Sequence, residues 1–535
     1  MPVNAAGRAL AVLLLSAALL QAGRIKIWVT LSDKGSAPAD LFHAGPPGSA
    51  DLRSYENLPL YPPYLAALSR AGLAVQAGLK WQNRVSGMIE ASRLGDLRAL
   101  ACVASIAPMP RKARAKPLPR APFAWRPLAK PAAASADSVD YGAARALHDS
   151  LKVSKLHAWL AATGQTPGQG MRVAVIDADF HLGSPIFADM KTRIRDQYDF
   201  AGHQAKAVDD KFADSHGAEC MSLIGGNLLG TYVGAAPYAD FLLYRAEIND
   251  SELYVEEDYV AAAIERAVDS GAQVINISLG YRYEYDSGPD LAYSEFDGRT
   301  RPSSLAALGA ARRNVVVSIA MGNLPDSTPV LPSLTAPADA DSVLSVGIED
   351  RLRRHCSYSC TGPSADGRVK PEVVSMGIGT CTVAVADPNQ TAGTVANYAG
   401  TSFAAPAVAG VALLLRQLRP DATAEEVRQA LIRTADRYDR PDGLVGHGLV
   451  DAAAAARALG LPIEGGLVRE SILRVFHVEG APIVLGWDPG KAKPTVQLID
   501  PAGRIFPVTS ELVGPLLRLM PKHPLSTGVY VVRIP

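Results

Sequence analysis

Between positions 140 and 460, short continuous apolar runs alternate with segments that have helical spacing. Four of these runs are β-branched or aliphatic: 173–176, 241–244, 274–279 and 315–319. The stretch 256–270 has apolar positions three and four residues apart and is followed by Gly271, a common residue after a helix. Continuous apolar strands are typical of a parallel sheet that is covered on both faces. The pattern therefore predicts an α/β fold with a doubly wound, mostly parallel sheet and helices on both faces.

The regions on either side of this domain have different patterns. Residues 24–110 combine strand-like runs with one helical segment near 64–72, which predicts a small α+β module. Residues 111–139 are rich in proline and basic residues, so we expect an extended linker. Residues 466–535 contain strand-like runs separated by turn residues and lack helical periodicity, which predicts a C-terminal all-β module.

The first 22 residues have the pattern of a signal peptide. Arg8 precedes an apolar run at 10–20, and small residues follow near Gly23. The alternative is a buried N-terminal helix, but a polar, strand-like segment follows at once. No later stretch is long and apolar enough to predict a transmembrane helix. We therefore expect a secreted protein that is extracellular or attached to the cell surface.

Composition excludes some partners and leaves the cysteine pairing open. The chain has 53 basic and 53 acidic residues, so its overall charge gives no reason to expect a nucleic acid or an anionic membrane as partner. Hydrophobic residues make up 48% and charged residues 20%, as in globular proteins. The number of cysteines is odd, so at least one is free or pairs elsewhere. We expect one disulfide among Cys356, Cys360 and Cys381, and the sequence does not indicate which two of them pair.

Three segments present a reactive side chain at the end of a predicted element. Asp177 ends an apolar strand, His216 begins a predicted helix, and Ser402 lies at the N-terminus of a buried apolar helix. Each residue alone is explained as readily by a structural role: a capping aspartate, a core histidine or an N-cap serine. Together they supply an acid, a base and a nucleophile, since serine becomes nucleophilic when a base removes its proton.

Two further segments fit the same chemistry. Asn323 ends an apolar strand after Met321 and Gly322, and its amide could stabilise an oxyanion together with the Ser402 N–H. The strand that ends in Ser278-Leu279-Gly280 could pair with the backbone of an extended peptide. We therefore predict Ser278, Leu279, Gly280, Met321 and Gly322 as substrate-binding residues. No group of residues in the sequence identifies a metal site.

These segments resemble, in their chain order, the subtilisin-like (subtilase) serine proteases. The most specific is Gly400-Thr-Ser-Phe-Ala-Ala-Pro406, supported by His216-Gly217 and Asp177. The similarity covers residues 140–460 and is strongest to secreted subtilases of Bacteroidetes-type bacteria. It implies a subtilisin-like fold, the catalytic triad Asp177, His216 and Ser402, the oxyanion role of Asn323, and endopeptidase activity on protein or peptide substrates. It also makes a structural calcium ion conceivable without identifying its ligands, and no other cofactor is expected.

The resemblance gives the terminal modules a meaning. Residues 24–110 are similar to a subtilase propeptide, which would assist folding and inhibit the enzyme until it is removed. The basic linker then predicts cleavage within 104–138. Residues 466–535 are similar to a secretion-sorting β-sandwich.

The sequence departs from the family pattern near the expected triad. Ala178 and Asp179 follow Asp177, and if the strand continued, Asp179 would share a face with Asp177 and could disturb its ionisation. Met321 stands where the family usually has a small residue, beside the expected specificity pocket. Asp179 and Ala218 favour an alternative, a catalytically inactive subtilase-like scaffold that binds peptides or partners. An esterase is disfavoured, because no Gly-x-Ser-x-Gly motif surrounds Ser402.

Overall fold

A computed structural model of the chain describes most of the predicted modules. It describes residues 23–35, 55–109, 139–209, 216–248, 251–283, 285, 289–324, 332–350, 352–377, 382–385, 394–397 and 399–463, and strands β16 to β22 after residue 470. The predicted signal peptide at 1–22, residues 111–138 of the predicted linker, and Cys381 lie outside the described residues.

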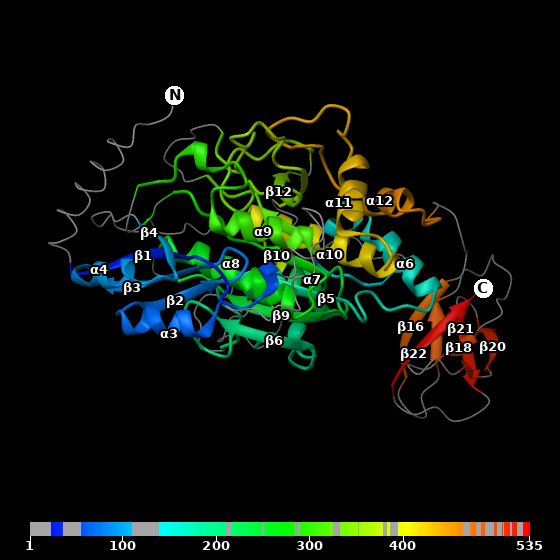
Figure 1. Cartoon of the computed structure of the whole chain (residues 1–535). Helices are drawn as coiled ribbons and strands as arrows, with labels where there is room; N and C mark the ends of the chain where they lie inside the picture. The colour runs from blue at the N-terminus through cyan, green and yellow to red at the C-terminus, as the bar shows by residue number, and fades with distance from the viewer. Residues whose placement is uncertain are drawn as a thin grey trace.

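The α/β domain is built around a seven-stranded sheet in which all neighbouring strands are parallel (Figure 1). In sheet order the strands are β13 (Val373–Met376), β12 (Leu344–Glu349), β11 (Val316–Ala320), β10 (Val274–Ile277), β5 (Arg172–Asp177), β9 (Asp240–Arg245) and β6 (Ile194–Asp199). Strand β5 is an inner strand between β10 and β9, so its carboxyl end is flanked by other strand ends. The predicted α/β fold class is confirmed.

Helices cover both faces of this sheet. One face carries α8 (Val255–Asp269) and α9 (Pro302–Arg312). The other face carries α5 (Arg145–Leu151), α6 (Val153–Ala162), α7 (His216–Gly225), α10 (Thr401–Leu418), α11 (Ala424–Arg433) and α12 (Ala452–Ala458). Side chains of β5 alternate between the two cores: Val173 and Val175 join the second group, whereas Ala174 and Ile176 join the first. Both faces are therefore buried, which explains the continuous apolar strands.

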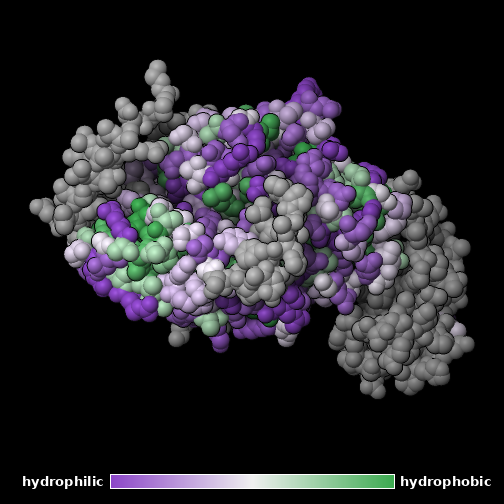
Figure 2. All heavy atoms as spheres, viewed as in Figure 1, coloured by the Kyte–Doolittle hydropathy of each residue, from purple (hydrophilic) through white to green (hydrophobic). Residues whose placement is uncertain are grey.

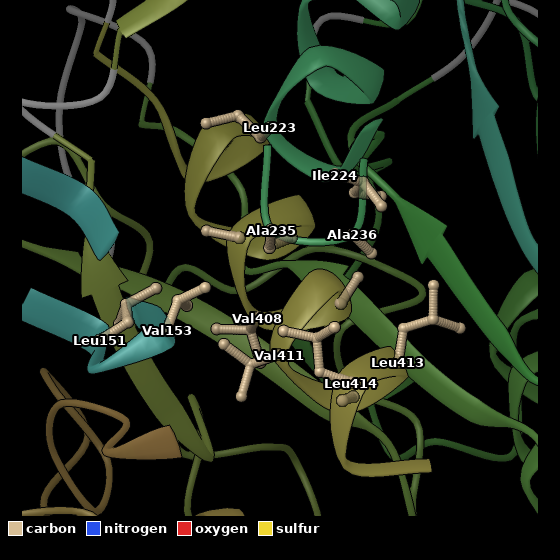
Figure 3. Packing of buried hydrophobic residues seen from close by; sticks show 14 of the residues in the cluster. Leu151, Val153, Leu223, Ile224, Ala235, Ala236, Val408, Val411, Leu413 and Leu414 are labelled. Carbon is tan, nitrogen blue, oxygen red and sulfur yellow. The ribbon is translucent and has the colours of Figure 1, made fainter. Parts of the chain in front are cut away.

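Helix α10 is the central helix of its face. Figure 3 shows Val408 and Val411 of α10 among apolar side chains of α7 and of the loop that contains Ala235. By length and composition this helix could cross a membrane, but 94% of it is buried inside the domain. Within the described residues it is the one helix that meets this test, and its burial explains its apolar sequence as that of a core helix.

The described part of residues 24–110 forms a separate N-terminal module. Its antiparallel sheet has the order β2 (Ala74–Leu79), β3 (Arg84–Glu90), β1 (Arg24–Leu31) and β4 (Val103–Pro108). Helices α3 (Pro62–Arg70) and α4 (Leu94–Arg98) complete it, with a core of its own. The sequence pattern does not indicate β3, whose centre holds Ser86 and Gly87. Figure 2 shows hydrophobic residues gathered over this module on the face seen there.

The N-terminal module packs against α8 and α9 of the α/β domain. The Glu265 carboxylate of α8 accepts hydrogen bonds from the backbone N–H groups of Lys80 and Trp81, at 2.8 and 3.0 Å. The buried Asp258 of the same helix pairs with Arg84 at 3.2 Å and accepts a hydrogen bond from Trp28 at 2.7 Å. Buried carboxylates of one domain thus meet donors of the other, so the two surfaces are specifically matched.

The C-terminal strands form two antiparallel sheets. The first has the order β16 (Ser471–His477), β22 (Gly528–Ile534), β18 (Gln497–Ile499) and β19 (Ile505–Phe506). The second has the order β17 (Ile483–Gly486), β21 (Leu516–Pro521) and β20 (Val508–Val513).

The remaining elements are short. They are β7 (Asn227–Leu228), β8 (Tyr232–Val233), β14 (Thr382–Val385), β15 (Thr394–Asn397), and the 3₁₀ turns η2 (Ala91–Arg93), η3 (Pro185–Phe187), η4 (Met190–Thr192) and η5 (Tyr293–Glu295).

The expected disulfide between neighbouring cysteines is not formed by the two described members of the group. Cys356 and Cys360 are both buried free thiols. They belong to different cores, because Cys356 packs with the cluster around α10 and Cys360 packs with the cluster around α8. Proximity in sequence was a poor guide, since the chain crosses from one face of the sheet to the other between them.

Candidate functional site

Asp177 and His216 meet at the carboxyl end of the central sheet. Asp177 is the last residue of β5 and is fully buried. Its Oδ1 atom lies 2.5 Å from Nδ1 of His216 and accepts a second hydrogen bond from the Ala178 N–H at 2.8 Å. His216 is the first residue of α7, and its side chain is 22% exposed. The carboxylate therefore fixes one ring nitrogen and leaves the other for a different partner.

Gly217 permits this close approach. A Cβ atom at position 217 would lie 2.7 Å from the Asp179 carbonyl and 3.1 Å from Cβ of Asp177. Any larger residue would thus push α7 away from the end of β5. Gly217 is therefore explained by packing as well as by the resemblance to the family.

Opposing effects act on the His216 imidazole. Burial is the largest single effect and lowers its pKa, but the charge and hydrogen bond of Asp177, together with smaller contributions from Cys220, raise the pKa well above its ordinary value. The Cys220 sulfur lies 3.9 Å from Nδ1 of the same ring. Burial raises the pKa of Cys220 to about 12, so this thiol is neutral at neutral pH. The carboxylate is then the charge that acts on the imidazole, and the buried neutral thiol is inert.

Ser402 is the second residue of α10, and side chains hold its backbone carbonyl. In an uninterrupted helix this carbonyl would accept from the N–H of residue 406, but Pro406 has none. The Ser278 hydroxyl donates to it at 2.8 Å and the Cys220 thiol at 3.3 Å. The Ser402 hydroxyl donates to the Ser278 carbonyl at 3.3 Å. The start of α10 is therefore attached to α7 and to the end of β10.

Asn323, which follows β11, is held by Thr401, the residue before Ser402. The Asn323 side-chain oxygen accepts hydrogen bonds from the Thr401 N–H at 3.0 Å and from its hydroxyl at 3.1 Å. The Thr401 hydroxyl also accepts from the Gly322 N–H at 3.2 Å. Because the amide oxygen is engaged, the two N–H groups of Asn323 remain as donors.

Asp179 does not share a face with Asp177, which corrects the expectation that it would. Strand β5 ends at Asp177, so the alternation of side chains stops there. The buried Asp179 carboxylate instead accepts from Arg245 at 2.6 Å, and Arg245 also pairs with Asp199 at 3.2 Å. A cation thus compensates the extra carboxylate, and the feature that most favoured an inactive scaffold has a structural explanation.

The predicted substrate-binding residues lie at two neighbouring strand ends. Ser278 and Leu279 are buried and Gly280 is exposed, directly after β10. Met321 is fully buried in the core cluster on the α8 side, so its side chain lies beneath this region. Gly322 follows with φ of 101°, a conformation that favours glycine.

Asp177, His216 and Cys220 also lie near enough to one another to hold a metal ion. They form the one such group among the described His, Cys, Asp and Glu residues. Their chemistry argues against it. The imidazole already uses Nδ1 for Asp177, and the thiol is protonated at neutral pH, whereas a metal requires a thiolate. A nitrogen and a sulfur ligand also do not suit calcium, which prefers oxygen.

Two residues of the site were not found from the sequence. Thr401 orients Asn323, and the signal for it was its place between Gly400 and Ser402 in the most specific segment. Arg245 compensates Asp179, and it could have been suspected as a basic residue at the end of an apolar strand.

Comparisons with known proteins identify the family of the chain. The model of the family Peptidase_S8, described as the subtilase family, matches residues 168–448, which is more than half of the chain. The chain is similar to the serine protease AprX of Bacillus subtilis (strain 168), with 26% identity over 54% of this chain and 67% of that protein. It is 28% identical to subtilisin E of the same organism over 60% of this chain and 72% of that protein.

A solved structure agrees at the level of the fold. The crystal structure of fervidolysin from Fervidobacterium pennivorans, a keratinolytic enzyme related to subtilisin, matches 92% of this chain and 68% of its own, with a TM-score of 0.53 and 22% identity. With a family model that spans the whole site, the chain belongs to the subtilase family and is a subtilisin-like serine endopeptidase.

Proposed function

We propose that this peptidase hydrolyses peptide bonds through an acyl-enzyme, with Asp177, His216 and Ser402 as its catalytic triad. The observation that carries the proposal is the 2.5 Å contact between Asp177 and the Nδ1 atom of His216. The Cys220 sulfur lies 3.9 Å from that Nδ1 atom and 3.3 Å from the Ser402 carbonyl, so it links the histidine to the start of α10. The Asp177 contact sets the tautomer in which the other ring nitrogen, Nε2, can accept a proton.

Each residue then has a defined task. The Ser402 hydroxyl turns from the Ser278 carbonyl to His216 and transfers its proton to Nε2 as the oxygen attacks the substrate carbonyl. His216 later gives this proton to the leaving amine, and Asp177 stabilises the imidazolium between the two steps. Water then attacks the acyl-enzyme: His216 takes the proton of the water and gives it to the Ser402 oxygen as the ester bond breaks and the carboxylic acid leaves.

The oxyanion of the tetrahedral intermediate would be stabilised by the Asn323 side chain and the Ser402 N–H. Thr401 holds the Asn323 oxygen, so the N–H groups need no reorientation when negative charge develops. The Ser402 N–H lies in the first turn of α10, where backbone donors are free of helical partners. The end of β10 supplies backbone groups for an extended substrate chain, which suits proteins and peptides of varied sequence.

A fluorophosphonate probe tests the proposed triad. The purified full chain is treated with the probe, with Ser402→Ala alongside, and the modified peptide is identified by mass spectrometry. Label on Ser402 in the wild type alone is the expected result. A folded wild-type chain without label, after removal of its N-terminal module, would favour the inactive scaffold that binds peptides or partners.

The raised pKa of His216 predicts an alkaline shift in activity. The imidazole must be neutral to accept the Ser402 proton, so kcat/KM is low below its pKa and rises as the pH passes through it. We expect the midpoint of this rise to lie above the ordinary histidine value of about 6.5. A pH profile with a small peptide substrate measures it, and a midpoint at or below that value contradicts the role given to the Asp177 carboxylate.

We also propose that the N-terminal module is an inhibitory propeptide. Its docking on α8 through Asp258 and Glu265 supports a specific complex between the module and the peptidase domain. Cleavage within the basic segment at 104–138 would separate the two. In the same proposal residues 1–22 direct export, and residues 466–535 serve in secretion or surface attachment.

Arg84→Ala is expected to release this propeptide. Asp258 is fully buried, and without Arg84 its carboxylate loses its cationic partner, so docking weakens by about 2 kcal/mol, or roughly 30-fold. The measurement is the rate at which the probe labels the full chain, which should rise by a similar factor. Arg98→Ala, an exposed arginine of α4 in the same module, is the matched control. Equal labelling rates in the two variants would contradict the proposed contact.

A further inference from the structure

Arg245 joins the end of β9 to the loop that follows Asp177. Its Nε atom donates to the Asp179 carboxylate at 2.6 Å, and its Nη1 atom donates to the Asp199 carboxylate at 3.2 Å. The side chain of Asp179 is fully buried, and those of Asp199 and Arg245 are 5% and 13% exposed. Two different nitrogens of one planar group thus hold two carboxylates in fixed directions.

The strand end that carries Arg245 also holds the backbone of Asp177. Arg245 is the register partner of Asp177 in the pairing of β9 with β5, and the Ala246 N–H donates to the Asp177 carbonyl at 2.9 Å. On the other side, Asp199 is its partner in the pairing of β9 with β6. The Asp199 carboxylate also accepts from the Gly202 N–H at 2.7 Å. Arg245 thus stands at the end of an inner strand, with the ends of both neighbouring strands paired beside it.

Asp179 supports the first turn of α7 with its backbone. Its carbonyl accepts a hydrogen bond from the Ala218 N–H at 3.2 Å, one of the donors that have no helical partner at a helix start. The contact is close, since a Cβ atom on Gly217 would lie 2.7 Å from the same carbonyl oxygen. His216 is the first residue of this turn. The side chain of Asp179 is therefore tied to β9, and its backbone to the helix that begins with the histidine.

We propose that Arg245 is a positioning residue for the pair Asp177 and His216. By holding Asp179, it fixes the loop on which α7 rests, and so keeps Oδ1 of Asp177 at 2.5 Å from Nδ1 of His216. The inference rests on the proposed function, since it assumes that this pair acts on Ser402. Arg245 acts on turnover through the geometry of the pair and has no part in binding the substrate.

Arg245→Lys tests the proposal. Lysine keeps the positive charge, so the two carboxylates keep a cation between them. A single ammonium group cannot hold both carboxylates in the directions that the planar guanidinium sets. We expect kcat to fall by about 10-fold with little change in KM, since a small misplacement of a catalytic group slows the chemical step. Kinetics on a small peptide substrate measure both constants.

The pH profile of kcat/KM separates positioning from a loss of stability. Burial lowers the pKa of His216, whereas the contact with Asp177 raises it. A looser contact therefore lowers this pKa, and the midpoint of the rise in kcat/KM should move to lower pH in Arg245→Lys. Cys220 is the other described titratable group that acts on the ring, and it stays neutral, so the shift reports the Asp177 contact.

Arg266→Lys is the matched control. Arg266 also holds a carboxylate with two nitrogens, because its Nε and Nη2 atoms donate to Asp196 at 2.7 and 2.8 Å. It belongs to α8, on the face of the sheet opposite α7. The same substitution should therefore leave kcat and the midpoint of the pH profile near their wild-type values.

The outcomes separate this inference from the function on which it rests. If Arg245→Lys does not fold, Asp179→Ala replaces it, since this variant removes the tie and leaves Asp199 as the partner of the guanidinium. We expect the same fall in kcat and the same shift. A folded variant with wild-type kcat, or with a lower kcat and an unmoved midpoint, overturns the inference. A wild type that the fluorophosphonate probe does not label at Ser402 overturns the proposed triad, and the inference with it.

Discussion

Asp177→Asn is expected to lower kcat by about 10⁴-fold while the protein remains folded. The asparagine side chain has nearly the same shape, but its N–H₂ group can replace the oxygen that now faces Nδ1 of His216 at 2.5 Å. The imidazole would then carry its proton on Nε2. A protonated Nε2 atom cannot accept the proton of Ser402. The loss therefore concerns the tautomer and charge of His216 and not the packing around it.

The measurement is kcat on a small peptide substrate, with circular dichroism to show that the variant is folded. Asp179→Asn is the matched control, because it changes a neighbouring buried carboxylate that pairs with Arg245 and not with His216. We expect a much smaller change in kcat for this control, with its main effect on stability. Similar losses in both variants would mean that the two carboxylates act as a unit, and that Asp177 has no separate role.

Asn323→Ala is expected to lower kcat by about 10²- to 10³-fold with little change in KM, the usual effect of removing one oxyanion donor. The Asn323 donors matter after the substrate carbonyl becomes tetrahedral, so substrate binding is affected less than turnover. Thr401 and Gly322 stay bonded to each other in the variant, which preserves the neighbouring backbone.

Kinetics at several substrate concentrations separate the two constants. Asn227→Ala, which removes an amide that bonds Asp189 far from Ser402 in the chain, is the matched control and should leave kcat near the wild-type value. A rise in KM with kcat unchanged would show that Asn323 binds the substrate and does not stabilise the oxyanion.

The parallel sheet was predictable because burial on both faces gives long apolar strands with no alternation. The run from Val173 to Ile176 is apolar throughout, even though alternate residues contribute to the two cores. Helix α10 was predictable for the same reason, since its whole circumference is apolar. Strand β3 was missed, because Ser86 and Gly87 interrupt its apolar pattern.

The site was predictable only in its most specific residues. Asp177, His216 and Ser402 each stand at the boundary of an element, which the sequence indicates. Contacts across the sheet were not predictable: the pairing of Asp179 with Arg245 joins residues 66 positions apart, and no local pattern reports it.

Pro406 has a consequence for how the first turn of α10, with Ser402, can move. The first turn of an ordinary helix frays because its hydrogen bonds are few and open to water. Here the Ser402 carbonyl is bonded to Ser278 and Cys220, so fraying would have to detach α10 from β10 and α7 together. The proposed nucleophile Ser402 is therefore held at its carbonyl by two neighbouring elements, although it stands near the end of a helix.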